Sequence, residues 1–181
     1  MRIFQSMSRD YVYETSKKDK LVITTFGNEN IDSKNCIFFV HGLKGFKDWG
    51  FGPYTGKYLA DKGFFVVTFN FSHNGIGDKL TEFTELDKFA ENTISLEIKE
   101  LSEIIDAYKN GFFDNKAVNK IGLLGHSRGG GVSILNAVNN SSVDAVCTWS
   151  AVSTFDRYSD RQKQEWRQIG YFSSQFHGTC G

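Results

Sequence analysis

The segment Gly125-His126-Ser127-Arg128-Gly129 places a serine at the centre of a G-x-S-x-G pattern, between an apolar run and a helix-like run. Ser127 therefore falls in a predicted tight turn from a strand into a helix. The flanking glycines let the neighbouring elements approach closely, and the strained turn exposes the hydroxyl. The start of the helix favours the anion that develops when a hydroxyl attacks a carbonyl carbon. We therefore predict that Ser127 is a nucleophile.

Regularly alternating strands and helices must position this serine. The apolar runs Cys36–Val40 and Phe64–Phe69 predict buried strands. A helix starting near Pro53 joins them into a strand-helix-strand unit. Before this unit, Tyr11–Thr15 and Leu21–Phe26 predict an antiparallel hairpin. Periodicity then predicts a helix over 87–110, a strand over 121–124, a helix over 129–138 and a strand over 143–149. The pattern indicates an α/β fold with a mostly parallel central sheet and helices on both faces.

The loop that follows the Cys36–Val40 strand is the second informative segment. It begins His41-Gly42-Leu43-Lys44-Gly45 and lies roughly 85 residues before Ser127. With the G-x-S-x-G turn it makes residues from about 20 to 155 resemble the first six strands of the α/β-hydrolase fold. The loop over 41–50 and the segment 125–130 most resemble the esterase and dienelactone-hydrolase-like branch, which includes acyl-peptidase relatives.

This resemblance implies an oxyanion hole made of backbone N–H groups. One donor is the N–H of Leu43, in the loop after the third strand, and the other is the N–H of Arg128, directly after the nucleophile. The resemblance also implies that His41 and His126 shape loops and do not act as the general base. We interpret His73 as a loop histidine in the same way.

The remaining catalytic residues are harder to assign. The resemblance implies an acid after a seventh strand and a histidine after an eighth, and the sequence shows neither strand. We therefore expect a fold that lacks its last two strands, with a truncated or frame-shifted chain end. An alternative completes the triad with Asp156 and His177. Against it, an aspartate at a helix start is commonly an N-terminal cap, and a histidine in a tail is commonly solvated.

Length and composition limit the other classes of function. The 181 residues favour one domain over 1–181, in which 156–181 is the start of a cap or a frayed tail. Twenty-one basic residues balance twenty-one acidic ones without a Lys/Arg-rich stripe, so we expect no nucleic-acid partner. No segment is apolar enough for a signal peptide or a membrane span, so we expect a cytoplasmic protein with no membrane partner.

Three features argue against cofactors and metals. Cys36, Cys147 and Cys180 are far apart, which suggests neither a disulfide framework nor a zinc site. No group of His, Cys or carboxylate residues has metal-ligand spacing along the chain. The glycine-rich loops lack both a phosphate-binding Lys-Ser/Thr ending and the G-x-G-x-x-G of dinucleotide-binding oxidoreductases. We therefore expect no cofactor and no metal.

The sequence leaves two functional hypotheses. The first is a serine hydrolase that cleaves a small carboxylic ester, thioester or amide through an acyl-enzyme on Ser127. The second is a catalytically impaired fragment that binds ligands or associates with itself through an unpaired sheet edge. The absence of a seventh and an eighth strand motivates the second hypothesis. The G-x-S-x-G pattern also occurs by chance in glycine-rich chains, but its place between a strand and a helix favours a catalytic role.

Overall fold

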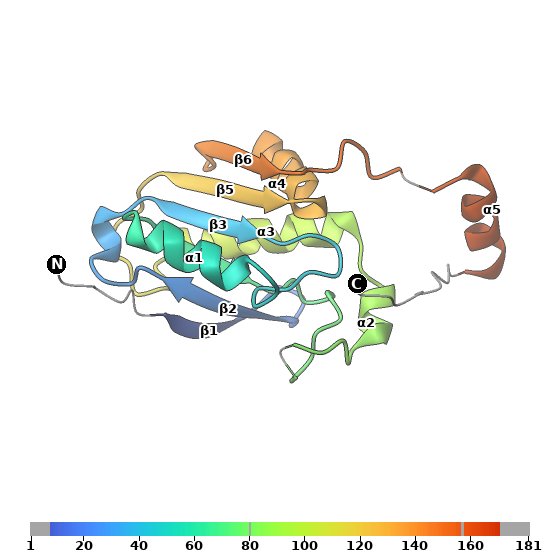
Figure 1. Cartoon of the computed structure of the whole chain (residues 1–181), viewed down its shortest axis with the longest axis horizontal. Helices are drawn as coiled ribbons and strands as arrows, with labels where there is room; N and C mark the ends of the chain where they lie inside the picture. The colour runs from blue at the N-terminus through green and yellow to red at the C-terminus, as the bar shows by residue number, and fades with distance from the viewer. Residues whose placement is uncertain (1–7, 80, 157, 171–181) are drawn as a thin grey trace.

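Six strands form the central sheet of the computed structural model, which describes residues 8–79, 81–156 and 158–170 (Figure 1). Their order is β1-β2-β4-β3-β5-β6. The first two, β1 (Arg9–Glu14) and β2 (Lys20–Phe26), form the predicted antiparallel hairpin, and β2 also pairs antiparallel with β4. A short 3-10 helix, η1 (Ile31–Ser33), leads into the parallel part of the sheet.

The other four strands run parallel to one another. These are β3 (Cys36–Val40), β4 (Phe65–Phe69), β5 (Ile121–His126) and β6 (Ala145–Trp149). Their carboxyl ends meet at one edge of the sheet, where ligand sites of such sheets form. The predicted mostly parallel α/β sheet is confirmed, and the described residues contain no seventh or eighth strand.

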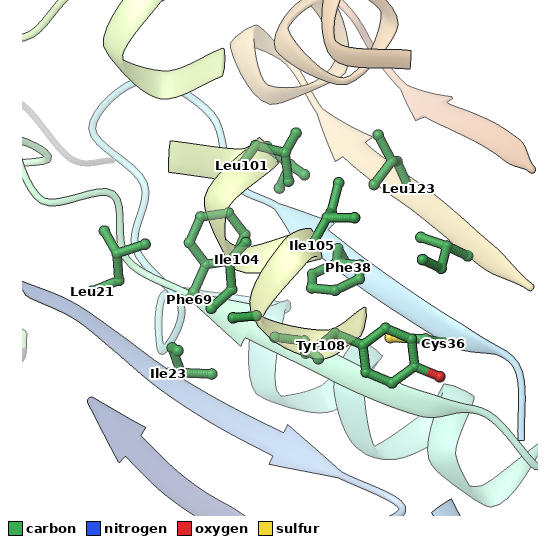
Figure 2. Packing of buried hydrophobic residues seen from close by; sticks show 14 of the residues in the cluster. Leu21, Ile23, Cys36, Phe38, Phe69, Leu101, Ile104, Ile105, Tyr108 and Leu123 are labelled. Carbon is green, nitrogen blue, oxygen red and sulfur yellow. The ribbon is translucent and has the colours of Figure 1, made fainter. Parts of the chain in front are cut away.

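Helices cover both faces of the sheet. Helix α1 (Gly52–Asp61) lies over β2 and β4, while α3 (Ile94–Lys109) and α4 (Arg128–Asn139) lie on the opposite face (Figure 1). The core fills the space between the sheet and α3, as Figure 2 shows. The side chains labelled there are Leu21, Ile23, Cys36, Phe38, Phe69, Leu101, Ile104, Ile105, Tyr108 and Leu123, and all are buried.

The single helix predicted over 87–110 is wrong, because the chain forms two helices there. Helix α2 (Leu86–Ala90) ends before Thr93, and α3 begins after it. The Thr93 hydroxyl accepts a hydrogen bond from the N–H of Leu96 at 3.1 Å and so caps the start of α3. The apolar spacing that predicts the helix begins only at Ile94, so the polar residues before it and threonine, a typical N-cap residue, already mark this break.

The face that carries α1 is covered only in part. Burial alternates along β5, in which Ile121, Leu123 and Gly125 are buried and Gly122, Leu124 and His126 are partly exposed. After β6, helix α5 (Asp160–Ile169) occupies the segment predicted as a cap or frayed tail, of which 157 and 171–181 lie outside the described residues. No helix in the described ranges is long and apolar enough to cross a membrane.

Candidate active site

Ser127 occupies the single residue between β5 and α4. Its backbone has φ 53° and ψ −119°, a conformation that residues other than glycine rarely adopt. Its N–H donates to the carbonyl of Trp149 at 2.9 Å, and its carbonyl accepts from the N–H groups of Gly130 and Val152, each at 3.1 Å. Backbone from β6 and from the chain after it therefore holds the strained turn in place.

Two of the neighbouring glycines are required by close packing. A Cβ on Gly129 would collide with the carbonyl oxygens of Val40 and His41 at the end of β3. A Cβ on Gly125 would lie 2.5 Å from the carbonyl oxygen of Gly129. The helix that starts at Arg128 can therefore reach the sheet only because these positions lack side chains.

The loop after β3 lies directly against Ser127. A Cβ built on Gly42 would be 3.1 Å from the Cβ of Ser127, so the two backbones approach closely. Leu43 follows Gly42 and lines the same pocket as Ser127. The N–H of Arg128 is in the first turn of α4, where no intrahelical acceptor exists. Leu43 and Arg128 are thus near the serine, and their role as oxyanion donors remains a prediction.

His41 is a fixed part of this loop. Its Nδ1 lies 2.9 Å from the carbonyl oxygen of Gly42, and its Nε2 lies 3.3 Å from the backbone N of Phe71. These partners require a neutral ring that donates from Nδ1 and accepts at Nε2. Burial lowers the pKa of His41 to about 4; its bond to Gly42 opposes the shift and the charge of Arg128 adds to it. The ring is therefore unsuited to act as the general base for Ser127.

Aromatic side chains form most of the pocket beside Ser127. The pocket has a volume of about 270 Å³, and its walls include Phe39, Phe46, Trp49, Phe51 and His126. The ring of Phe51 lies edge-on to His126 at 4.9 Å between centroids. His41, Lys44 and Ser127 also line the pocket, so its wall combines aromatic rings with polar groups, and its small volume admits a compact group.

The side chain of Arg128 does not line the pocket and instead contacts α3. Its Nε lies 3.0 Å from Oε2 of Glu97, and the other carboxylate oxygen, Oε1, accepts a hydrogen bond from the side-chain amide of Asn92 at 2.8 Å. Burial raises the pKa of Glu97, and Arg128 and Asn92 oppose part of that shift. The sequence analysis missed this contact. Glu97 lies three residues after Ile94 and four before Leu101, on the apolar stripe of α3, and that spacing indicates a buried carboxylate.

The structure does not bring the predicted acid to Ser127. Asp156 is exposed and forms an ion pair with Lys163 of α5 at 2.7 Å, and it does not line the pocket. His177 lies outside the described residues. Within the described ranges, no imidazole forms a hydrogen bond with the hydroxyl of Ser127. The described part of the site therefore contains the predicted nucleophile, Ser127, without an assigned base.

Comparison with known proteins gives the fold. No protein-family model and no curated protein matches the chain. Among solved structures, the dienelactone hydrolase of Anabaena variabilis aligns at a TM-score of 0.64 and 17% identity, over 81% of this chain and 64% of that one. An α/β hydrolase from a Penicillium species aligns at a TM-score of 0.70 and 16% identity, over 91% of this chain and 52% of that one. A Pyrococcus furiosus esterase aligns at a TM-score of 0.63 and 18% identity, over 91% of this chain and 56% of that one.

These matches share the fold at low sequence identity. Each aligns with most of this chain, whereas the chain spans only about half to two thirds of the length of each matched structure. The chain thus has the α/β-hydrolase fold over the part that aligns, as the resemblance of the sequence implied.

Proposed function

We propose that this chain, which has the α/β-hydrolase fold, is a serine hydrolase that cleaves small carboxylic esters, thioesters or amides through an acyl-enzyme on Ser127. The observation that carries the proposal is the backbone of Ser127. Its φ of 53° and ψ of −119° form a conformation that a residue with a Cβ rarely adopts. Such strain persists where the surroundings enforce it and is concentrated at functional sites. The dienelactone hydrolase and esterase among the structural matches support the same reaction class.

The proposed reaction has two steps. In the first, Oγ of Ser127 attacks the carbonyl carbon, its proton passes to a base, and the alcohol, thiol or amine leaves with a proton. In the second, water attacks the acyl-serine and releases the carboxylic acid. The backbone N–H groups of Leu43 and Arg128 would donate to the negative oxygen that forms in both steps.

The reaction needs a general base, and His41 is unsuited to that role because it is buried and bonded at both ring nitrogens. His126 lines the pocket, but among the described residues no imidazole forms a hydrogen bond with the hydroxyl of Ser127, so these contacts assign no base. His177 or a histidine of a partner chain could supply the base. The ion pair between Asp156 and Lys163 counts against Asp156 as the acid, since that bond would first have to break.

The pocket suggests the size of the acyl group. About 270 Å³ is below the usual range of roughly 300–1,000 Å³ for sites that hold drug-sized ligands. Its aromatic walls favour an apolar acyl chain of a few carbons or a single ring. We therefore propose a compact acyl group as the preferred part of the substrate.

Labelling with a fluorophosphonate probe tests the nucleophile. Such probes react with activated serines, so wild-type protein should be labelled and Ser127→Ala should not. Ser142→Ala, which removes an exposed hydroxyl bonded to Lys109, is the matched control and should be labelled like the wild type. Absence of labelling in the wild type would contradict an activated Ser127.

A second candidate function is self-association through β6, which forms one edge of the sheet in the described residues. The opposite edge strand, β1, carries Arg9, Asp10 and Glu14, and such charges discourage pairing with other chains. The β6 sequence Ala-Val-Cys-Thr-Trp contains no charge, and Val146 and Trp149 are 37% and 49% exposed. An apolar groove of about 430 Å³ adjoins it on the face that α1 leaves open.

We propose that two copies pair their β6 strands antiparallel about a two-fold axis. Sedimentation should then show a dimer for the wild type and a monomer for Val146→Lys, which places a charge on the edge. Val12→Lys on the already charged β1 edge is the control and should stay dimeric. A wild-type monomer at high concentration would contradict this function.

A further inference from the structure

Three side chains with metal-binding atoms meet outside the Ser127 pocket. Asp19 lies in the turn between β1 and β2, His73 in the loop after β4, and Glu100 in α3. One ring nitrogen of His73 and one carboxylate oxygen from each acid lie within 4.8 Å of one another. Because tens of residues separate them along the chain, sequence spacing gave no sign of this cluster.

Glu100 is a buried acid without a cationic partner. Its exposure is 1%, and neither Glu100 nor Asp19 forms an ion pair with any lysine or arginine of the described residues. A carboxylate removed from water in this way is unfavourable unless a positive charge compensates it. No lysine or arginine of the described residues therefore neutralises these two acids.

Ser72 connects two of the three side chains. Its backbone N–H donates to Oε2 of Glu100 at 3.0 Å, and its hydroxyl donates to Oε1. The same hydroxyl oxygen lies 2.6 Å from Nδ1 of His73. Hydrogen bonds of this kind orient ligand side chains before a metal binds and tune their basicity. Ser72 therefore orients Glu100 and His73 towards each other.

We propose that Asp19, His73 and Glu100 bind one divalent transition-metal cation, with Zn²⁺ as the best match. Once both are deprotonated, the two carboxylates carry two negative charges, which a divalent cation neutralises. An imidazole ligand favours Zn²⁺ over Mg²⁺, which prefers oxygen atoms alone. Zinc bonds of about 2.0–2.1 Å place tetrahedral ligands about 3.3 Å apart, so modest side-chain rotations close the site.

The bound cation would connect three elements that are separate in the sequence. It would join the β1–β2 turn, the loop after β4 and helix α3. Asp19 and His73 are half-buried, which leaves the ion a route from solvent. With three protein ligands, at least one position stays open for water. The proposal concerns binding alone and does not depend on the chemistry of Ser127.

Calorimetric titration of the full chain, freed of metal by a chelator, tests the site with ZnCl2 and separately with MgCl2. We expect one Zn²⁺ per chain with much tighter binding than Mg²⁺, and a melting temperature that rises with the Zn²⁺ concentration. Asp19→Asn and His73→Gln, at half-buried positions, should each weaken Zn²⁺ binding at least about 100-fold. Ser72→Ala, which removes an outer partner, should weaken it about 10-fold to 100-fold.

Two controls separate this site from other metal-binding groups. Glu103→Gln alters a carboxylate of the same helix that bonds to Ser16, and Cys147→Ser removes an exposed thiol. Both should bind Zn²⁺ like the wild type. Absence of stoichiometric Zn²⁺ binding, wild-type affinity in Asp19→Asn and His73→Gln, or equal affinity for Mg²⁺ would overturn the proposal.

Discussion

The Nε of Arg128 lies 3.0 Å from Oε2 of Glu97, and both side chains are largely buried. This ion pair connects the residue that follows Ser127 to the first turn of α3. The start of α4, which carries the proposed oxyanion donor, is thereby fixed to a second helix as well as to the sheet. The contact also compensates a carboxylate that burial would otherwise leave uncompensated.

Arg128→Ala should destabilise the protein by about 3 kcal/mol, because it leaves the carboxylate of Glu97 buried without its cation. Urea unfolding monitored by tryptophan fluorescence measures this change. Arg161→Ala removes an exposed arginine from a similar pair with Glu165 and should change stability by less than about 0.5 kcal/mol. Equal losses of unfolding free energy in the two variants would show that the buried pair contributes no more to stability than the exposed pair.

Combining Arg128→Ala with Glu97→Gln should recover part of the lost stability, since the double variant contains no buried charge at this place. The backbone N–H of Arg128 remains in both variants. Probe labelling of Ser127 should therefore persist wherever the variant is folded. Loss of labelling in a folded Arg128→Ala protein would assign the side chain a direct role that its position does not support.

The buried ring of His41 makes stability depend on pH. Its pKa falls from 6.5 in the unfolded chain to about 4 in the folded protein. Between these values the unfolded chain binds more protons, so stability decreases as pH falls from 6.5 towards 4. The shift of about 2.5 units corresponds to about 3 kcal/mol once the pH reaches 4.

His41→Gln tests this dependence, because glutamine carries a donor and an acceptor and does not titrate. Unfolding free energies of wild type and variant should be measured from pH 7 to pH 4. The difference between the two proteins should shrink on acidification, since only the wild type loses the contribution of His41. Parallel curves for the two proteins would contradict the lowered pKa.

The sequence predicted the sheet well because each strand depends on a local pattern. Apolar runs such as Cys36–Val40 have few alternatives to a buried strand, and the two glycines around Ser127 restrict the turn to one geometry. The break between α2 and α3 was missed although the apolar spacing begins at Ile94, because the polar residues Glu91 and Asn92 and the capping signal of Thr93 were read as part of one helix.

Long-range contacts within the site could not be predicted in the same way. The bond between His41 and the N–H of Phe71 joins loops thirty residues apart, and nothing in either loop indicates the other. The cluster of Asp19, His73 and Glu100 likewise forms only because three elements meet. One sequence shows which residues can do chemistry, and the fold determines which of them meet.

Gly129→Ala should prevent normal packing of α4. A Cβ there collides with the backbone oxygens of Val40 and His41, which cannot move without disturbing β3. We expect a loss of about 3 kcal/mol or more and loss of Ser127 labelling. Gly122→Ala is the matched control, because its nearest atom would be 3.8 Å away and no strain results. A Gly129→Ala variant as stable as Gly122→Ala would show that α4 can shift freely from the sheet.

Ser127→Gly should be more stable than the wild type although it lacks the nucleophile. The φ of 53° at Ser127 is unfavourable by about 1–3 kcal/mol for a residue with a Cβ and is accessible to glycine. Part of this relief is lost, because the greater freedom of glycine stabilises the unfolded chain by about 0.5–1 kcal/mol. The net stabilisation of the folded protein should therefore be about 1 kcal/mol. Ser127→Ala keeps the Cβ and should show no such gain, while neither variant should react with the probe. Urea unfolding of the three proteins measures the difference. A Ser127→Gly protein less stable than Ser127→Ala would mean that the turn is not strained, and the main support for Ser127 as the nucleophile would be lost.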